Sequence, residues 1–284
     1  MLADCHIHMV LDGGWWKDAL ARHAQTPDRE LVRNTLKAYR ESGFDFLRDG
    51  GDRWGVGELA AQLAEEEKIT YRTPCFPIYK EGHYGSFIGR GYETPQQFRA
   101  LVREVKSRGG HFIKIMISGL MDFHSYGVLT DTPMAADEVK RLADTAHEEG
   151  FSVMAHANGD AAVSAAAEAG IESVEHGAYL SEQTLYRLKE AGTVWVPTLS
   201  TVANLCGEGR FPDEVVTPLR KRQMDTVRRA AELGVLLAPG SDAGAWAVRH
   251  AQGGRDEYRW MRQAIGGGAD AVLEKGIEAI RLRF

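Results

Sequence analysis

Short runs of apolar residues recur along the whole chain, and each is followed by a segment whose apolar positions have helical spacing. Runs of this length that are bounded by turn residues favour β-strands. We expect eight strands from this pattern, at Leu2–Met9, Phe44–Arg48, Tyr71–Tyr79, Phe112–Ser118, Ser152–Ala157, Ser173–Tyr179, Val194–Leu199 and Val235–Ser241.

Amphipathic helices are expected between these strands. The clearest patterns cover residues 94–108, 135–149, 160–169, 181–191 and 213–233. Thr94, Ser181 and Asp213 are residue types that cap helix N-termini with a side-chain oxygen. Several helical segments end on glycine, which readily adopts the left-handed conformation at a helix C-terminus; these are Gly43, Gly109, Gly150, Gly170, Gly192 and Gly234.

Alternation of strand and helix predicts parallel strands joined by right-handed crossovers. Eight such units in about 250 residues match a closed (β/α)8 TIM barrel better than an open sheet. The open doubly wound fold is the structural alternative, but no glycine-rich phosphate fingerprint follows the first strand. We therefore predict an α/β protein in which residues 1–284 form one barrel domain.

Composition narrows the classes of partner. Hydrophobic residues make up 44% of the chain and charged residues 26%, with a net charge of −6, and no basic stripe indicates nucleic-acid binding. No apolar run reaches the roughly 20 residues needed to span a bilayer. The few, widely spaced cysteines and the lack of a signal-peptide pattern at the N-terminus favour a cytoplasmic protein.

Polar residues with metal-binding chemistry lie on the first and fourth predicted strands. In ADCHIHM, His6 and His8 are two residues apart and share one strand face, so that Cys5 and Ile7 should face the helices. In HFIKIMIS, Lys114 lies inside an apolar run, where an unpaired cation is costly. Its alternatives are a salt bridge inside the barrel or a carbamate formed with CO2, which would be an anionic ligand.

Three more strands end in similar groups: His156 in MAHANGD, His176 in VEHGAY and Asp242 in LLAPGSDAG. Taken singly, each histidine is compatible with a structural role, and Asp242 with a helix N-cap. Barrel enzymes, however, carry their chemistry at the carboxyl ends of the strands, which converge on one axis. Five strands that each deliver a metal-competent group favour one shared site over five separate structural roles.

The chain resembles the amidohydrolase superfamily, and within it the imidazolonepropionase-like and prolidase-type metal-dependent hydrolases. The motifs that carry the resemblance occur in order from about residue 4 to residue 246. They are DCHIHM, FLRDGG, FIKIMISG, MAHANG, VEHGAYL, VPTLS and GSDAG.

The resemblance implies a binuclear centre of two divalent ions, for which zinc is the favoured metal. His6 and His8 would hold one ion, and His156 and His176 the other. Lys114, as a CO2-derived carbamate, would bridge both. Asp242 would bind the first ion and act as the catalytic proton shuttle for a metal-bridging hydroxide.

One departure from the family concerns the small β-sandwich that most members carry. The chain has little length before His6 and after Asp242, so we expect a barrel without the flanking sandwich. In larger members the sandwich covers the bottom of the barrel. A partner subunit in a homo-oligomer is one way to cover that end here.

Candidates for substrate contact come from the loops after the third and fourth strands. Basic and hydroxyl side chains there suit a carboxylate ligand, and an ordinary solvated loop is the alternative. The candidates are His83, Tyr84, Arg90, His124 and Tyr126.

The reaction expected from the resemblance is hydrolysis of an amide-type C–N bond in a small molecule, of the dipeptide or N-acyl amino acid class. Hydrolysis of a lactone, ester or phosphoester by the same metals is the nearest alternative. A mononuclear deaminase is less favoured, because MAHANGD lacks the glutamate usual near that histidine whereas Lys114 is present. A non-catalytic ligand-binding barrel is the alternative from another class.

Overall fold

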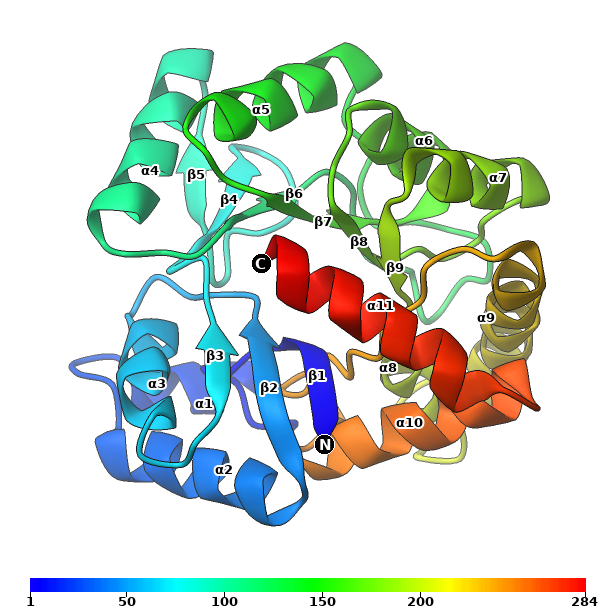
Figure 1. Cartoon of the computed structure of the whole chain (residues 1–284), viewed down its shortest axis with the longest axis horizontal. Coiled ribbons are helices and arrows are strands. Elements are labelled where there is room, and N and C mark those ends of the chain that lie inside the picture. The colour runs from blue at the N-terminus through cyan, green and yellow to red at the C-terminus, as the bar shows by residue number, and fades with distance from the viewer.

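The computed structural model describes residues 1–284 and shows helices arranged around a central ring of strands (Figure 1). Every strand pair is parallel. The strands form two sheets, ordered β1-β2-β3 and β5-β4-β6-β7-β8-β9. Their bounds are β1 Leu2–Ile7, β2 Phe44–Asp49, β3 Thr70–Arg72, β4 Pro77–Lys80, β5 Arg90–Tyr92, β6 Ile113–Met116, β7 Val153–Ala157, β8 Ser173–His176 and β9 Val194–Val196.

Two segments join the sheets into a ring. β3 and β4 belong to one stretch of chain, and β3 pairs with β2 whereas β4 pairs with β6. On the other side, residues 235–243 run between β9 and β1. The amide of Trp195 donates to the carbonyl of Leu236 at 2.8 Å, and the amide of Cys5 donates to that of Pro239 at 2.9 Å. The expected (β/α)8 architecture is therefore confirmed, with the third strand interrupted where Cys75 has a positive φ of 63°.

The predicted helices are confirmed to within one residue at each end. Thr94 and Ser181 cap α4 and α7 as expected, but Asp213 does not cap α9. Pro212 occupies the cap position, and the Asp213 carboxylate accepts the amide of Gly207 instead. None of the helices is both long enough and apolar enough to cross a membrane. Their bounds are α1 Trp16–Arg22, α2 Arg29–Glu41, α3 Val56–Ala64, α4 Pro95–Ser107, α5 Ala136–Glu148, α6 Gly159–Glu168, α7 Glu182–Ala191, α8 Ser200–Ala203, α9 Asp213–Leu233, α10 Gln252–Ile265 and α11 Ala269–Arg283.

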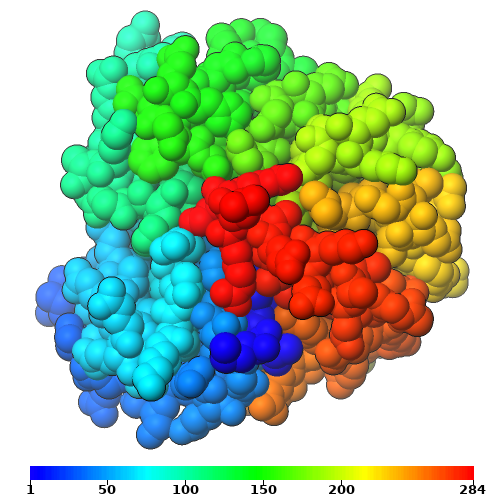
Figure 2. Space-filling model, in the orientation of Figure 1, coloured from blue at the N-terminus to red at the C-terminus, as the bar shows by residue number.

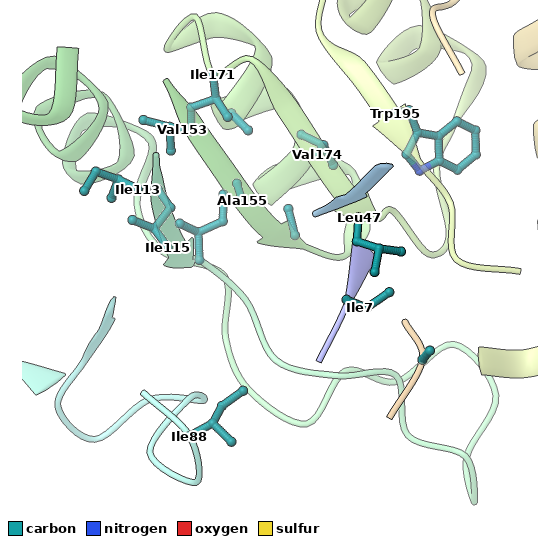
Figure 3. Packing of buried hydrophobic residues seen from close by; sticks show 14 of the residues in the cluster. Ile7, Leu47, Ile88, Ile113, Ile115, Val153, Ala155, Ile171, Val174 and Trp195 are labelled. Carbon is teal, nitrogen blue, oxygen red and sulfur yellow. The ribbon is translucent and has the colours of Figure 1, made fainter. Parts of the chain in front are cut away.

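The largest apolar core lies between the strands and the surrounding helices. Ile113 and Ile115 of β6 belong to it, together with Val153 and Ala155 of the neighbouring strand (Figure 3). Because side chains alternate across a strand, the residues between them point into the ring. Lys114 is one of these, as the sequence pattern predicts.

The first strand contains an irregularity that redirects its side chains. Asp4 pairs with Leu47 and Ile7 with Asp49, so β1 has one residue more than β2 over this interval. A β-bulge of this kind re-aims the side chains that follow it. Cys5 consequently packs in the inner cluster of the barrel rather than against the helices, which corrects the simple alternation expected for it. His6 and His8 nevertheless both face the site.

The end of the barrel at which the strands begin, called its lower end below, is covered by α11, which runs across it in Figures 1 and 2. Ile280 and Phe284 of this segment pack in the inner cluster with Phe46 and Phe112. The chain thus covers with its own helix the end for which a partner subunit was considered. Residues 1–284 contain no β-sandwich beside the barrel, and the strand outside the ring, β5, has three residues.

Candidate metal centre

The six predicted metal ligands gather at the upper end of the barrel. Five of them lie on the floor of a cavity of about 410 Å³: His8, Lys114, His156, His176 and Asp242. His6 is fully buried beside them, with its ring centroid 5.1 Å from that of His176. Strands β1, β6, β7, β8 and the segment after residue 235 therefore bring their polar groups to one place.

His6, His8 and Asp242 form the tightest group. Asp242 Oδ1 lies 3.5 Å from His6 Nε2 and 3.4 Å from His8 Nε2. One ligand atom from each of the three lies within 4.8 Å of the others, a spacing compatible with a shared cation. The second nitrogen of His6, Nδ1, lies 2.8 Å from Glu175 Oε2, so the Nε2 atom is directed toward the site.

His156 and His176 form a second pair, with ring centroids 4.5 Å apart. His176 Nδ1 is hydrogen-bonded to the Thr198 hydroxyl at 2.8 Å, which leaves its Nε2 available. His156 Nε2 lies 3.1 Å from the carbonyl oxygen of Gly119, which leaves its Nδ1 available. Each histidine is thus oriented through one nitrogen while the other is open to a ligand.

Several buried polar atoms in this cluster have no hydrogen-bond partner: His6 Nε2, His8 Nδ1, Lys114 Nζ and Asp242 Oδ1. Buried polar atoms are almost always paired, since an unpaired one loses its hydration without replacement. Burial also lowers the pKa of the Lys114 amine and raises that of the Asp242 carboxyl. These unpartnered atoms are therefore available as ligands for a bound ion or molecule.

Burial holds the histidines neutral. Desolvation, with the nearby Lys114 charge, lowers the pKa of His8 and of His156 to about 3. The pKa values of His6 and His176 are lowered in the same way, the latter mainly by burial and the facing His156. Neutral imidazole is the form that coordinates metal ions.

The backbone at the cluster adopts conformations that side chains seldom take. His176 has a φ of 70° and Asp242 a φ of 57°, both in the left-handed region. Such strain is held only by the surrounding structure and concentrates at functional sites. Gly50 contributes in another way, because a Cβ atom there would lie 2.3 Å from the His8 ring. The His8 ring therefore occupies space that only glycine leaves open.

Beneath the cluster lies a charged network that the sequence analysis did not identify. Arg48 donates to Glu175 Oε1 and to the Ser173 hydroxyl, both at 2.8 Å, and to the carbonyl of Cys5 at 2.7 Å. Both charged side chains are fully buried. Their positions are visible in the motifs FLRDGG and VEHGAYL, but their pairing across 127 residues is not.

The cavity above the floor has mainly apolar walls. Aromatic side chains from five segments of the chain supply most of them, and one cation lies among them, Arg210. The aromatic lining residues are Trp15, Trp16, Tyr84, Phe87, Phe123, Phe211 and Trp246.

Of the five residues expected to contact substrate, Tyr84 lines the cavity, with its ring centroid 4.9 Å from that of His156. The other four do not line it. His83 is bound to Asp131 at 3.0 Å and Arg90 is paired with Glu104. His124 packs on Phe211, and Tyr126 packs on Tyr179.

Comparison with known proteins agrees with the motifs. Residues 2–258 match the model of the amidohydrolase family. An uncharacterized protein of Mycobacterium tuberculosis is 33% identical over 255 residues, which cover 83% of this chain and 66% of that protein. Ochratoxinase of Aspergillus niger is 27% identical over 283 residues, covering 85% of this chain and 57% of the enzyme. The chain thus spans 66% and 57% of the length of these two relatives.

Solved structures show the same fold. The crystal structure of A. niger ochratoxinase superposes with a TM-score of 0.78 at 20% identity, covering 99% of this chain and 70% of that one. A Xaa-Pro dipeptidase with methionine bound in its active site gives a TM-score of 0.77 at 22% identity, covering 99% and 75% of the two chains.

Proposed function

The chain belongs to the amidohydrolase family, and from this premise we propose that it hydrolyses an amide-type C–N bond in a small molecule. The proposed substrates are dipeptides or N-acyl amino acids. The named relatives, an ochratoxinase and a Xaa-Pro dipeptidase, support the assignment as a hydrolase.

The observation that carries the proposal is the set of unpartnered buried atoms at the cavity floor. Imidazole nitrogens, a carboxylate oxygen and an amine converge there without satisfying one another. Nitrogen and oxygen donors of these types suit Zn2+ and related divalent ions. We propose that two divalent ions bind here, one held by His6, His8 and Asp242 and the other by His156 and His176.

When bound, such ions polarise a carbonyl oxygen and supply a hydroxide nucleophile at neutral pH. The proposed role of Asp242 is to accept a proton from the attacking water and to donate it to the departing amine. Its Oδ1 atom is buried and unpartnered at the cavity floor, and burial raises its pKa toward the range in which a carboxyl both takes and gives a proton.

Lys114 is proposed to carry a carbamate that joins the two sets of ligands. Its side chain is 1% exposed and its amine has no partner. Burial lowers the pKa of the amine and so increases the fraction of the neutral form, which is the form that reacts with CO2. Carbamylation would convert a buried cation into an anion among five other metal-competent groups.

The test is a turnover screen of protein loaded with Zn2+ in the presence of bicarbonate, with metal content measured on the same preparation. The substrates are N-acyl amino acids, dipeptides, lactones and a phosphoester. We expect about two ions per chain and hydrolysis of N-acyl amino acids or dipeptides in the screen. Turnover of lactones or the phosphoester alone would overturn the amide assignment, and two bound ions with no turnover of any class would favour a binding protein.

A further inference from the structure

Arg210 lies at the cavity wall among three aromatic rings. Its guanidinium carbon is 3.9 Å from the centroid of the Trp246 ring, 5.2 Å from that of Phe211 and 5.3 Å from that of Trp15. The rings hold the planar cation by stacking, which leaves its edge free to donate hydrogen bonds. Arg210 is exposed, lines the cavity and forms no salt bridge, so its donors are open to a ligand that enters the cavity.

A second donor lies beside it. The indole Nε1 of Trp246 is buried and has no acceptor, and Trp246 also lines the cavity. A buried N–H group of an indole normally finds a partner. Two adjacent side chains, on loops 36 residues apart in sequence, thus both lack an acceptor at the same wall of the cavity.

The basic residues of the loop region after β4 are already paired with carboxylates. Lys80 is paired with Glu138 at 2.8 Å, in the same loop region in which His83 and Arg90 are bound to carboxylates. The loop that the sequence analysis favoured for a substrate carboxylate therefore has its basic groups engaged within the protein. At the aromatic wall, Arg210 has no such carboxylate.

We propose that Arg210 and the Trp246 indole N–H bind the carboxylate of the substrate, while the surrounding aromatic rings contact its apolar side chain. Arg210 is then the residue that selects acids over neutral amides. This inference rests on the proposed amide hydrolysis and narrows its substrates to N-acyl amino acids or dipeptides with a large apolar residue next to the free carboxylate. The guanidinium suits this carboxylate because it presents paired donors.

The test compares two amides that differ in the carboxylate alone, N-acetylphenylalanine and N-acetylphenethylamine, with metal-loaded protein. A charge-assisted hydrogen bond corresponds to about a 10- to 100-fold preference, so we expect the wild type to prefer the acid in kcat/KM by that factor. Arg210→Gln should bring the preference close to one, mainly through a higher KM for the acid. Arg210→Lys should keep part of it, and Trp246→Phe should lower it several-fold.

Arg220→Gln is the matched control, because Arg220 also stacks on a tryptophan, Trp260 at 5.8 Å, but does not line the cavity. This variant should retain the preference for the acid. A wild type without preference, or an Arg210→Gln variant that keeps it, would overturn the inference even though amide hydrolysis stands.

A binding measurement separates the inference from the proposed reaction. Calorimetry with metal-depleted protein follows the same two compounds without turnover, and we expect tighter binding of the acid that is lost in Arg210→Gln. If the acid binds selectively but no amide is hydrolysed by the metal-loaded enzyme, the proposed reaction fails and the anion site stands. If the acid shows no Arg210-dependent binding and no Arg210-dependent kinetics, the anion site fails.

Discussion

The two ends of the barrel interior both bury charged side chains, but they differ in how these are partnered. At the lower end, every nitrogen of the Arg48 guanidinium has an acceptor, and both oxygens of Glu175 are hydrogen-bonded. At the upper end, Lys114 and Asp242 keep buried polar atoms without partners. The same barrel thus contains a satisfied network and an unsatisfied one.

The presence or absence of hydrogen-bond partners distinguishes structural from functional buried charges more clearly than burial does. A buried polar group costs free energy unless it is hydrogen-bonded, so a satisfied network is compatible with a purely structural role. An unsatisfied cluster is stabilised when a ligand supplies what is missing. Glu175 belongs to both ends, because one of its oxygens pairs with Arg48 and the other with His6. It therefore links the network below to the proposed metal centre above.

The largest effect is expected at the upper end, from Asp242→Asn. Asn keeps the shape and one acceptor oxygen but cannot take a proton near neutral pH. Asn also tolerates the left-handed backbone that residue 242 adopts, with φ of 57°. We expect a folded protein with most of its metal and a loss in kcat of about 10²–10⁴-fold. Kcat and metal content measured on one preparation check this, and near-wild-type turnover would rule out the proton-transfer role.

The next largest effect is expected at the lower end, from Arg48→Met. The substitution removes the ion pair and leaves the Glu175 carboxylate buried without its cation. Such a loss typically costs about 3–5 kcal/mol in the free energy of unfolding. Urea unfolding of metal-loaded protein measures it. Adding Glu175→Gln to this variant should restore part of the loss, because the buried negative charge is then removed. A loss below about 1 kcal/mol would show that the pair is not satisfied in the way the distances indicate.

Glu175→Gln alone tests the link between the two ends. Glutamine retains the shape but weakens the hydrogen bond to His6 Nδ1, and loss of such a partner typically lowers metal affinity about 10–100-fold. Competition with a chelator measures the affinity. Ser173→Ala is the matched control, since Ser173 contacts Arg48 and Glu175 but not His6. Equal losses of affinity in both variants would contradict a specific role for the His6 contact.

Much of the fold could be predicted because it depends on local pattern. The strand rhythm predicts the ring, and alternation along HFIKIMIS places Lys114 inside it. The bulge in β1 could not be predicted, since it depends on pairing with β2 and moves Cys5 to the inner side. Coverage of the lower end by α11 is equally non-local, because Phe284 packs against Phe112 at a ring distance of 5.2 Å.

The candidate site likewise contains residues that the sequence could predict and residues that it could not. Its six metal-competent residues stand out because each lies on a predicted strand or directly after one, and the carboxyl ends of barrel strands converge. The loop residues gave no such signal. His83 and Arg90 resemble free basic groups until Asp131 and Glu104 are placed beside them. Arg210, in a glycine-rich loop, has no local feature that marks it, and its place at the cavity wall depends on Trp15 and Trp246 from distant loops.

The smallest effect is expected from a hydrogen-bonded group at the protein surface. It gives a reference value for the changes in stability inside the barrel. Thr94 caps α4 by accepting the amide of Gln97 at 3.3 Å, and the Gln97 side chain accepts the Thr94 amide at 3.1 Å. Thr94→Ala removes half of this capping box and should cost about 1 kcal/mol in the free energy of unfolding, whereas Thr94→Ser should cost little. Neither variant should alter metal content or kcat, because α4 contributes no residue to the cavity. Urea unfolding and turnover on the same samples measure both quantities. If Thr94→Ala lowered stability as much as Arg48→Met, partnering inside the barrel would carry no more free energy than partnering at its surface, and the contrast between the two ends would lose its energetic meaning.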